Sequence, residues 1–145
     1  MHKHILIPTD GSDLSKNAVR YGMSLANAVN AKVTGITVTQ PFRVYSTNAE
    51  MLTDTPDSYM QRMAGVAAER LEQVKAAAPA GVTCDAVHVE HEHPFQAIID
   101  TAKERGCDLI VMASHGRRGI AAVVLGSETV KVLTHSAIPV LVVRS

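Results

Sequence analysis

The sequence predicts an α/β protein in which helices cover both faces of one parallel sheet. Short apolar, β-branched segments alternate along the chain with longer segments that repeat apolar residues every three or four positions. Residues 109–112 form an unbroken apolar run, as expected for a strand that is buried on both faces of a sheet. Because strands and helices alternate, right-handed crossovers and five parallel strands are expected.

The expected elements follow one another without an internal repeat or a domain boundary, so residues 1–145 are expected to form one domain. Strands are predicted at residues 5–7, 32–39, 83–89, 109–112 and 140–143. Helices are predicted from residue 14 to 29, from 60 to 78, from 94 to 105 and from 127 to 135. Ser12 or Asp13 can cap the first helix, Pro94 opens the third and Gly106 ends it.

Two further features of the pattern concern the first half of the chain. Residues 40–57 follow no period, and a loop of this length in a compact domain is usually functional or mobile. The helices on either side of it are predicted to bury their apolar positions. These positions are Leu14, Ala18, Tyr21, Leu25 and Val29 in the first helix, and Met60, Met63, Ala67, Leu71, Val74 and Ala78 in the second.

Composition and charge exclude several classes of function. Fourteen basic and fourteen acidic residues cancel, which removes the positive field that nonspecific nucleic-acid binding requires. No apolar run approaches the roughly 18 residues that a membrane span needs. The start of the chain lacks a signal peptide, so a cytoplasmic protein is expected. Cys84 and Cys107 stand in separate segments and are expected to be reduced, mostly buried thiols.

Two loops carry the chemistry, and both follow strands that a doubly wound sheet places at its ligand-binding edge. The first contains Pro8, Thr9, Asp10, Gly11 and Ser12, and the second runs through residues 113–119 and 125–129. A phosphate needs backbone N–H groups that no Cβ shields, together with the N-terminus of a helix. Gly116, Gly126 and Ser127 supply these features, with Ser127 expected to cap the fourth helix.

Further side chains of the second loop can donate hydrogen bonds to anionic oxygens. His115, Arg117 and Arg118 are the candidates. For the two arginines, ordinary solvated loop charge is the competing interpretation.

The spacing of the second loop resembles the nucleotide loop of the universal stress protein family, written G-x2-G-x9-G-[S/T]. Residues 113–116 read ASHG, nine residues follow at 117–125, and Gly126-Ser127 close the pattern. Residues 5–12 (ILIPTDGS) resemble the opening strand of the family, and residues 139–143 (PVLVV) its closing strand. The resemblance spans the whole chain.

The resemblance implies a sheet of order 3-2-1-4-5, of the adenine nucleotide alpha hydrolase-like type, a homodimer and, in one branch of the family, bound ATP. It matches Asp10 to an acidic residue near the ribose, and Val38 to the position whose backbone meets the adenine. Residues 112–116 would wrap the phosphates with Gly126 and Ser127. The site implied in this way comprises Pro8, Thr9, Asp10, Val38, Met112, Ala113, His115, Gly116, Arg117, Arg118, Gly126, Ser127 and Glu128.

The sequence departs from the family pattern at Ala113, where the ATP-binding branch has its first glycine. A methyl group there could obstruct the backbone or resist a positive φ by about 1–2 kcal/mol, but an ordinary strand conformation would cost almost nothing. An interaction module that has lost the nucleotide is therefore the alternative function. Residues 9–15 also faintly resemble the loop of adenylating ATP pyrophosphatases, a remote alternative.

Several residues keep two interpretations open. Asp10 contacts a ligand or merely stabilises the turn at Gly11. His88, His91 and His93 invite a zinc hypothesis, but strand alternation favours a solvated strand end, and a divalent ion would more plausibly be Mg²⁺ held by nucleotide phosphates.

Catalysis and assembly complete the expectations from the sequence. No residue matches a catalytic nucleophile or base, so at most slow hydrolysis is expected. The last strand, Val140 to Val143, would be a long apolar sheet edge. Pairing with a second copy of the chain would bury it; the alternative is a cover from its own chain.

Overall fold

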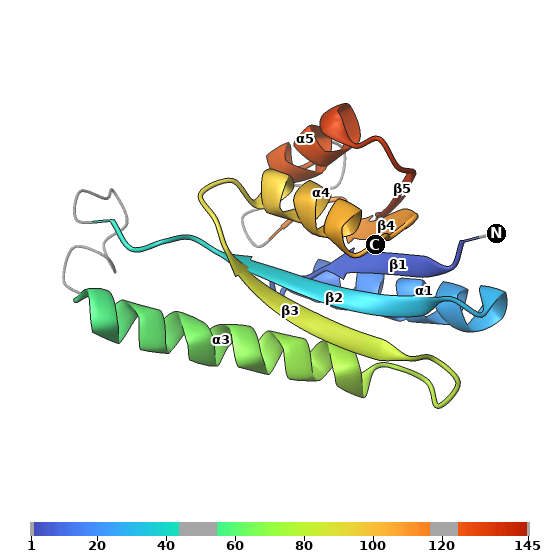
Figure 1. Ribbon diagram of the computed structural model, residues 1–145, viewed down its shortest axis with the longest axis horizontal. Helices are drawn as coiled ribbons and strands as arrows, with labels where there is room; N and C mark the ends of the chain where they lie inside the picture. The colour runs from blue at the N-terminus through green and yellow to red at the C-terminus, as the bar shows by residue number, and fades with distance from the viewer. Residues whose placement is uncertain (1, 44–54, 117–124, 145) are drawn as a thin grey trace.

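A computed structural model describes residues 2–43, 55–116 and 125–144. These residues form one five-stranded parallel sheet with the order β3-β2-β1-β4-β5 (Figure 1). The predicted fold class and strand order are therefore confirmed. The chain reverses direction across the sheet between β1 and β4, which places the exits of these two strands beside each other.

The observed elements lie within a few residues of the predicted ones. The strands are β1 (His4–Pro8), β2 (Lys32–Thr39), β3 (Cys84–Glu90), β4 (Leu109–Ala113) and β5 (Val140–Val143). The helices of the described residues are α1 (Asp13–Val29), α3 (Pro56–Ala76), α4 (Pro94–Glu104) and α5 (Ser127–His135). Helix α3 begins inside the segment predicted as loop, because the Thr55 hydroxyl accepts a hydrogen bond from the Ser58 N–H and Pro56 fits the first turn. Residues 44–54 lie outside the described residues.

Helices cover both faces of the sheet, and each face has its own apolar core (Figure 1). Ile5, Ile7 and Val111 face α1 and α3, whereas Leu6 and Ile110 face α4 and α5. The alternation along each strand follows from the two-residue period of β structure. Strands β1 and β4 are thus buried on both sides, as their apolar sequences predict.

Helix α1 packs against the sheet on a face that includes small residues the apolar period did not mark. Ala18 is buried as predicted, and Leu14, Leu25 and Val29 are partly buried against the core. Ser12 caps the helix, as expected, and its hydroxyl accepts from the Ser15 N–H. A Cβ at Gly22 would lie 2.4 Å from Ile7 Cδ1, so the helix approaches the sheet too closely for a side chain there. The prediction was wrong for Tyr21, which is 52% exposed, and for Met60 of α3, which is 54% exposed.

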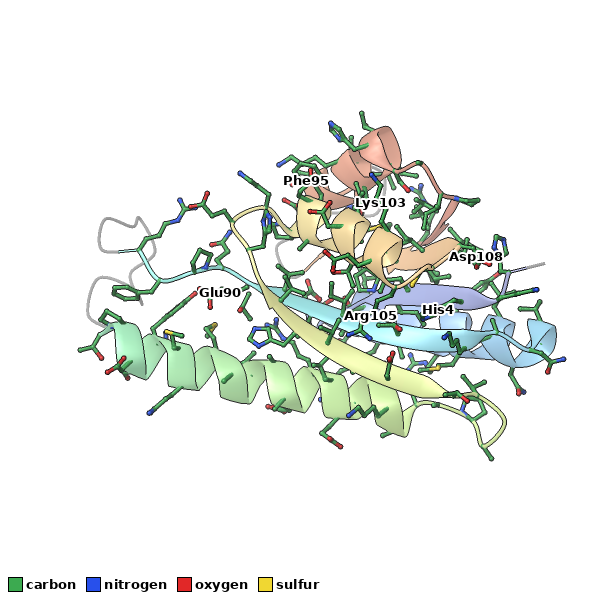
Figure 2. All side chains as sticks on the ribbon, in the orientation of Figure 1. His4, Glu90, Phe95, Lys103, Arg105 and Asp108 are labelled. Atoms are coloured by element: carbon green, nitrogen blue, oxygen red, sulfur yellow. The ribbon has the colours of Figure 1, made fainter. Side chains whose placement is uncertain are left out.

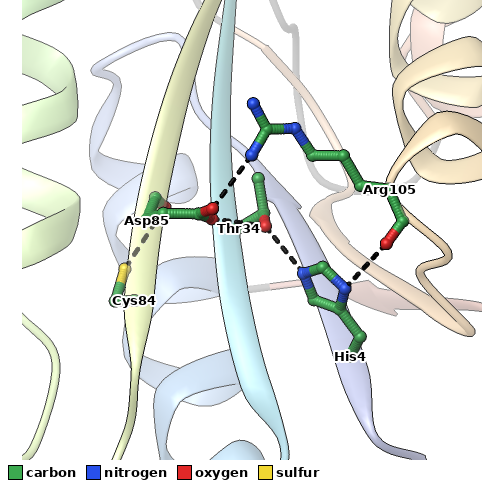
Figure 3. A network of polar contacts seen from close by, with 5 residues as sticks. All are labelled: His4, Thr34, Cys84, Asp85 and Arg105. Atoms are coloured by element: carbon green, nitrogen blue, oxygen red, sulfur yellow. Dashed lines mark hydrogen bonds and ion pairs between the residues drawn. The ribbon is translucent and has the colours of Figure 1, made fainter.

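A polar network joins three strands at the amino ends of the sheet, remote from the strand exits (Figure 3). The His4 imidazole is buried, with Nδ1 3.1 Å from the Arg105 carbonyl and Nε2 2.7 Å from Thr34 Oγ1. The Thr34 hydroxyl also lies 2.5 Å from Asp85 Oδ1, and the Arg105 guanidinium donates to Asp85 Oδ2 over 2.9 Å. The network ties β1, β2, β3 and the end of α4 together.

The amino and carboxyl ends of the strands carry different sets of side chains. His4 and Asp108 lie at the amino ends, whereas Glu90 ends β3 and Phe95 begins α4 at the carboxyl edge (Figure 2). The network therefore supports the fold from the side that faces away from the strand exits.

Burial lowers the pKa of His4 below its ordinary value of 6.5, and the positive charge of Lys32 lowers it further. The Arg105 carbonyl and the carboxylates of Asp85 and Asp108 act in the opposite direction. Unfolded His4 therefore binds its proton at a higher pH than folded His4. Between those two pKa values the unfolded chain holds more protons, so stability rises with pH.

We expect the free energy of unfolding to fall as the pH is lowered from about 7.5 to about 5, because protonation of His4 is unfavourable in the folded state. Urea denaturation at both pH values measures the slope. His4→Gln should flatten it, whereas His135→Gln, which removes an exposed histidine of α5, should leave it. Equal slopes in the wild type and His4→Gln would contradict the assignment.

Candidate functional site

A cavity of about 190 Å³ opens at the exits of β1 and β4, on the face covered by α4 and α5. Its position is the reversal point of strand order, where open α/β sheets place their ligands. Nine of the thirteen residues that the sequence nominates line it. These are Pro8, Thr9, Asp10, Val38, Met112, Ala113, His115, Gly116 and Glu128.

Asp10 holds the loop after β1 in shape. Its Oδ1 accepts hydrogen bonds from the Ser12 N–H at 2.9 Å and from the Ser15 hydroxyl at 2.7 Å. Gly11, with φ of +80°, completes this turn in a conformation that favours glycine. Oδ2 faces Gly116, where a Cβ would lie only 2.9 Å from it. Asp10 therefore stabilises the turn, and because its residue also lines the cavity, its contact with a ligand stays a prediction.

Two hydrogen bonds fasten the start of α5 to the exit of β4. The Gly126 N–H donates to the Ser114 carbonyl over 2.7 Å, and the Thr129 hydroxyl donates to the Ala113 carbonyl over 2.9 Å. The helix therefore begins directly beside the strand end. Its N-terminus faces the segment that the sequence nominates for phosphates.

Ala113 ends β4 in an ordinary conformation, since Asn30 alone among the described non-glycine residues has a positive φ. Its methyl group belongs to the core on the α1 face, together with Val111, whereas Met112 belongs to the core on the other face. The Ala113 backbone thus lines the cavity while its Cβ points into the opposite layer. The obstruction considered for this position does not arise.

Positions 126 and 116 leave little room for a side chain, because backbone atoms lie against Gly126 and a carboxylate lies against Gly116. A Cβ at Gly126 would lie 3.2 Å from both His115 Cα and the Ser114 carbonyl oxygen. Gly126 occupies the cap position of α5, and as a glycine it has no side chain that could cap the helix. The expectation that Ser127 caps it was wrong, because Gly126 is held as the last extended residue (φ −61°, ψ 151°) and Ser127 is the first helical one.

Glu128 reaches from α5 to the start of α4. Its Oε2 accepts a hydrogen bond from the Phe95 N–H over 3.0 Å, and Oε1 lies 3.6 Å from Lys131 Nζ. His93, the cap residue of α4, makes no capping hydrogen bond with its side chain. Glu128 therefore caps α4 from a neighbouring helix and has a structural role besides lining the cavity.

The sequence did not nominate five residues that complete the cavity. Ser15 supports Asp10, and Ile36, Pro94, Ile98 and Thr129 form walls. Ile98 stood out only as part of the apolar period of its helix, and Ser15 only as the last residue of the segment 9–15 that resembles the loop of adenylating ATP pyrophosphatases. Together with Val38 and Met112, the isoleucines make one side of the cavity apolar, which suits a flat organic ring more than a bare ion.

The remaining nominated residues lie beside the cavity or outside the described residues. Gly126 and Ser127 are not among the residues that line the cavity, although they directly precede Glu128, which does. Arg117 and Arg118 fall in the segment 117–124, which is not described. His115 is buried, with Nδ1 3.1 Å from Ser114 Oγ. Within residues 2–43, 55–116 and 125–144, no three His, Cys, Asp or Glu side chains are placed to hold a metal ion.

We expect Glu128→Ala to lower the free energy of unfolding by about 1 kcal/mol, because the first turn of α4 loses its acceptor. Glu128→Gln, which keeps a carbonyl oxygen, should lose less. Urea denaturation provides the measurement, and Glu72→Ala on the exposed side of α3 is the matched control. A cost no larger than that of Glu72→Ala would contradict the capping role.

Comparison with known proteins places the chain in a family. A sequence model described as "Universal stress protein family" matches residues 1–144. The chain is 30% identical to universal stress protein YxiE of Bacillus subtilis over 99% of its own length and 100% of that protein. It is also 30% identical to universal stress protein MJ0531 of Methanocaldococcus jannaschii, over 99% of the chain and 83% of the relative.

Solved structures of similar proteins share the fold. The structure of protein MJ0577 has a TM-score of 0.83 at 25% identity and covers 100% of this chain and 97% of its own. Universal stress protein UspA from Lactobacillus plantarum has a TM-score of 0.74 at 26% identity, covering 98% and 97%. The match over residues 1–144, the relatives at 30% identity and the shared fold establish that this chain belongs to the universal stress protein family.

Proposed function

We propose that this protein binds ATP in the cavity at the exits of β1 and β4 and acts as a regulatory protein of the stress response. The observation that carries the proposal is the convergence of residues from three separate loops on one partly apolar cavity beside the N-terminus of α5. The structure of a universal stress protein in complex with cAMP matches this chain with a TM-score of 0.69 and 29% sequence identity. The match covers 99% of this chain and 99% of that protein.

The cavity offers a distinct environment for each part of the nucleotide. The apolar walls, Val38, Ile98 and Met112 among them, suit the adenine ring. Asp10 suits the ribose hydroxyls, because a carboxylate accepts hydrogen bonds. The Gly116 backbone and the N-terminus of α5 suit the phosphates, since closely approached amides and the helix dipole favour negative charge. Mg²⁺ would be held by the phosphates themselves.

We propose binding rather than catalysis as the role of the cavity. Asp10 accepts hydrogen bonds from Ser12 and Ser15, and Glu128 accepts from the Phe95 amide, so both carboxylates already have structural partners. A general base must reach the proton it removes, and these two are oriented by other contacts. Slow hydrolysis remains compatible with this arrangement.

The second candidate function is that of an interaction module that binds no nucleotide. It was considered because Ala113 replaces the first glycine of the family pattern. Since the methyl group of Ala113 packs in the core on the α1 face, it supplies no reason against a ligand in the cavity. Nucleotide binding is therefore the better supported of the two functions. None of the described helices is long and apolar enough to cross a membrane.

We also propose that two copies of the chain pair through β5 in the cytoplasm. Strand β5 lies at the edge of the sheet, with Val140, Leu141 and Val142 only half-buried. An uncovered apolar edge favours pairing with another chain. Beside it, Val143 and the exposed Tyr21 of α1 line a groove of about 510 Å³, which extends the surface available to a partner copy.

ATP with Mg²⁺ should stabilise the protein against thermal unfolding, by about 2.7 kcal/mol at a hundredfold excess over Kd. Gly126→Ala should weaken binding about tenfold, because its Cβ would press on the His115 and Ser114 backbone at 3.2 Å. Thermal shift and isothermal titration calorimetry measure both effects. Gly116→Ala is a second variant of the same kind, with Asp10 as the obstacle.

Gly65→Ala is the matched control for these substitutions, because nothing lies within 4 Å of the Cβ it would add to α3. It should stabilise the helix by up to about 1 kcal/mol and leave the affinity for ATP unchanged. A wild-type protein that shows no shift with millimolar ATP would favour the interaction module instead.

Val142→Lys should convert the dimer to a monomer, because it places a charge in the apolar edge that the partner copy would cover. Sedimentation velocity gives the oligomeric state. Val130→Lys alters an exposed valine of α5 and should remain dimeric. A wild-type chain that sediments as a monomer would refute pairing through β5.

A further inference from the structure

A second cavity, of about 300 Å³, lies between α1 and α3, on the sheet face opposite the proposed nucleotide site. Buried Val19 of α1 and Val74 of α3 form its floor. Three basic residues, Lys16, Arg20 and Arg70, are among those that line it. No carboxylate of the described residues is among its lining side chains, although the chain as a whole is neutral.

The two cations of α1 are placed unfavourably for the isolated helix. Lys16 and Arg20 are four residues apart and therefore lie on the same side of α1, where like charges repel. Asp13 is the one acidic residue of that helix, and in the described part of the chain neither cation takes part in an ion pair. Arg20 does donate to Asn17 Oδ1, and both residues also line the groove beside β5. An anion between the helices would relieve the repulsion.

Arg70 enters the cavity from α3 in a fixed position. Its Nη1 donates to Thr37 Oγ1 over 3.3 Å, and the Thr37 hydroxyl donates to the Thr9 carbonyl over 2.8 Å. Glu69 and Glu72 are one and two residues away along α3 and point to other sides of the helix, so they do not line the cavity. A guanidinium carries its donors in a planar fork that matches phosphate oxygens.

We propose that this cavity is a binding site for a small phosphorylated anion, held by Lys16, Arg20 and Arg70 above the valine floor. Three positive charges from two helices match a multiply charged phosphoryl group better than a single carboxylate. The low-dielectric walls concentrate the positive field on the cavity. The amide of Gln73, which also lines the cavity, can donate to a further oxygen. This site does not depend on nucleotide binding at the other face.

Pyrophosphate titrated into the methyl-labelled full chain at constant ionic strength tests the site by NMR. Saturable shifts are expected at the methyl groups of Val19 and Val74, which form the floor. Ile98 and Met112 report on the opposite cavity and distinguish binding there. Shifts confined to Ile98 and Met112, or the lack of saturable shifts at millimolar pyrophosphate, would overturn the proposal.

Two charge variants identify the residues responsible. Lys16→Gln changes an exposed side chain of α1, leaves the fold intact and should weaken pyrophosphate binding about tenfold. Arg70→Lys keeps the charge but loses the planar fork, and should also weaken it. Lys75→Gln, near the end of α3 and outside the cavity, is the control and should bind as the wild type does. Unchanged affinity in Lys16→Gln and Arg70→Lys would refute the assignment.

Discussion

The hydrogen bond from the Gly126 N–H to the Ser114 carbonyl is the contact on which the candidate site depends. At 2.7 Å it brings the start of α5 against the end of β4. The backbones approach so closely that a Cβ at Gly126 would press on Ser114 and His115. Glycine is needed there for space rather than for an unusual dihedral angle, since its φ is −61°. This contact places the N-terminus of α5 beside Gly116, whose backbone in turn lies against the Asp10 carboxylate.

The sheet was predictable because burial on both faces leaves a strong signal in a short segment. Residues 109–112 are apolar throughout. This is expected because both faces of a parallel strand between two helical layers are buried, so neither face needs polar side chains. The contact face of α1 was harder to predict. The periodic spacing of apolar residues shows which side chains are hydrophobic, but it does not show how closely a helix approaches the sheet. Gly22 is buried against Ile7 because it is small, while Tyr21, the larger neighbour, is left at the surface.

The candidate site likewise has a part that could be predicted from the sequence and a part that could not. Its loops follow strand ends and carry glycines at a recognisable spacing, so Asp10, Gly116 and Gly126 could be nominated from the sequence. The polar partners could not, because a hydrogen bond between elements distant in sequence has no period. Glu128 caps a helix that begins 34 residues earlier at Pro94. The network of buried His4, buried Thr34 and exposed Asp85 joins three strands through side chains that give no signal along the chain.

Thr9 separates the two cavities, and its contacts determine how they can influence each other. Its N–H donates to the Ile36 carbonyl, its carbonyl accepts from the Thr37 hydroxyl, and its own hydroxyl accepts from the Gly11 N–H. A residue held by three hydrogen bonds forms a rigid wall, so the cavities are separate compartments. One route from an anion beside Arg70 to the opposite cavity is displacement of Thr37, which is bonded to the Thr9 carbonyl just before Asp10. A ligand can act on a distant site only by shifting an equilibrium between two conformations. Coupling between the two cavities along this route therefore requires that the end of β1 has two alternative positions.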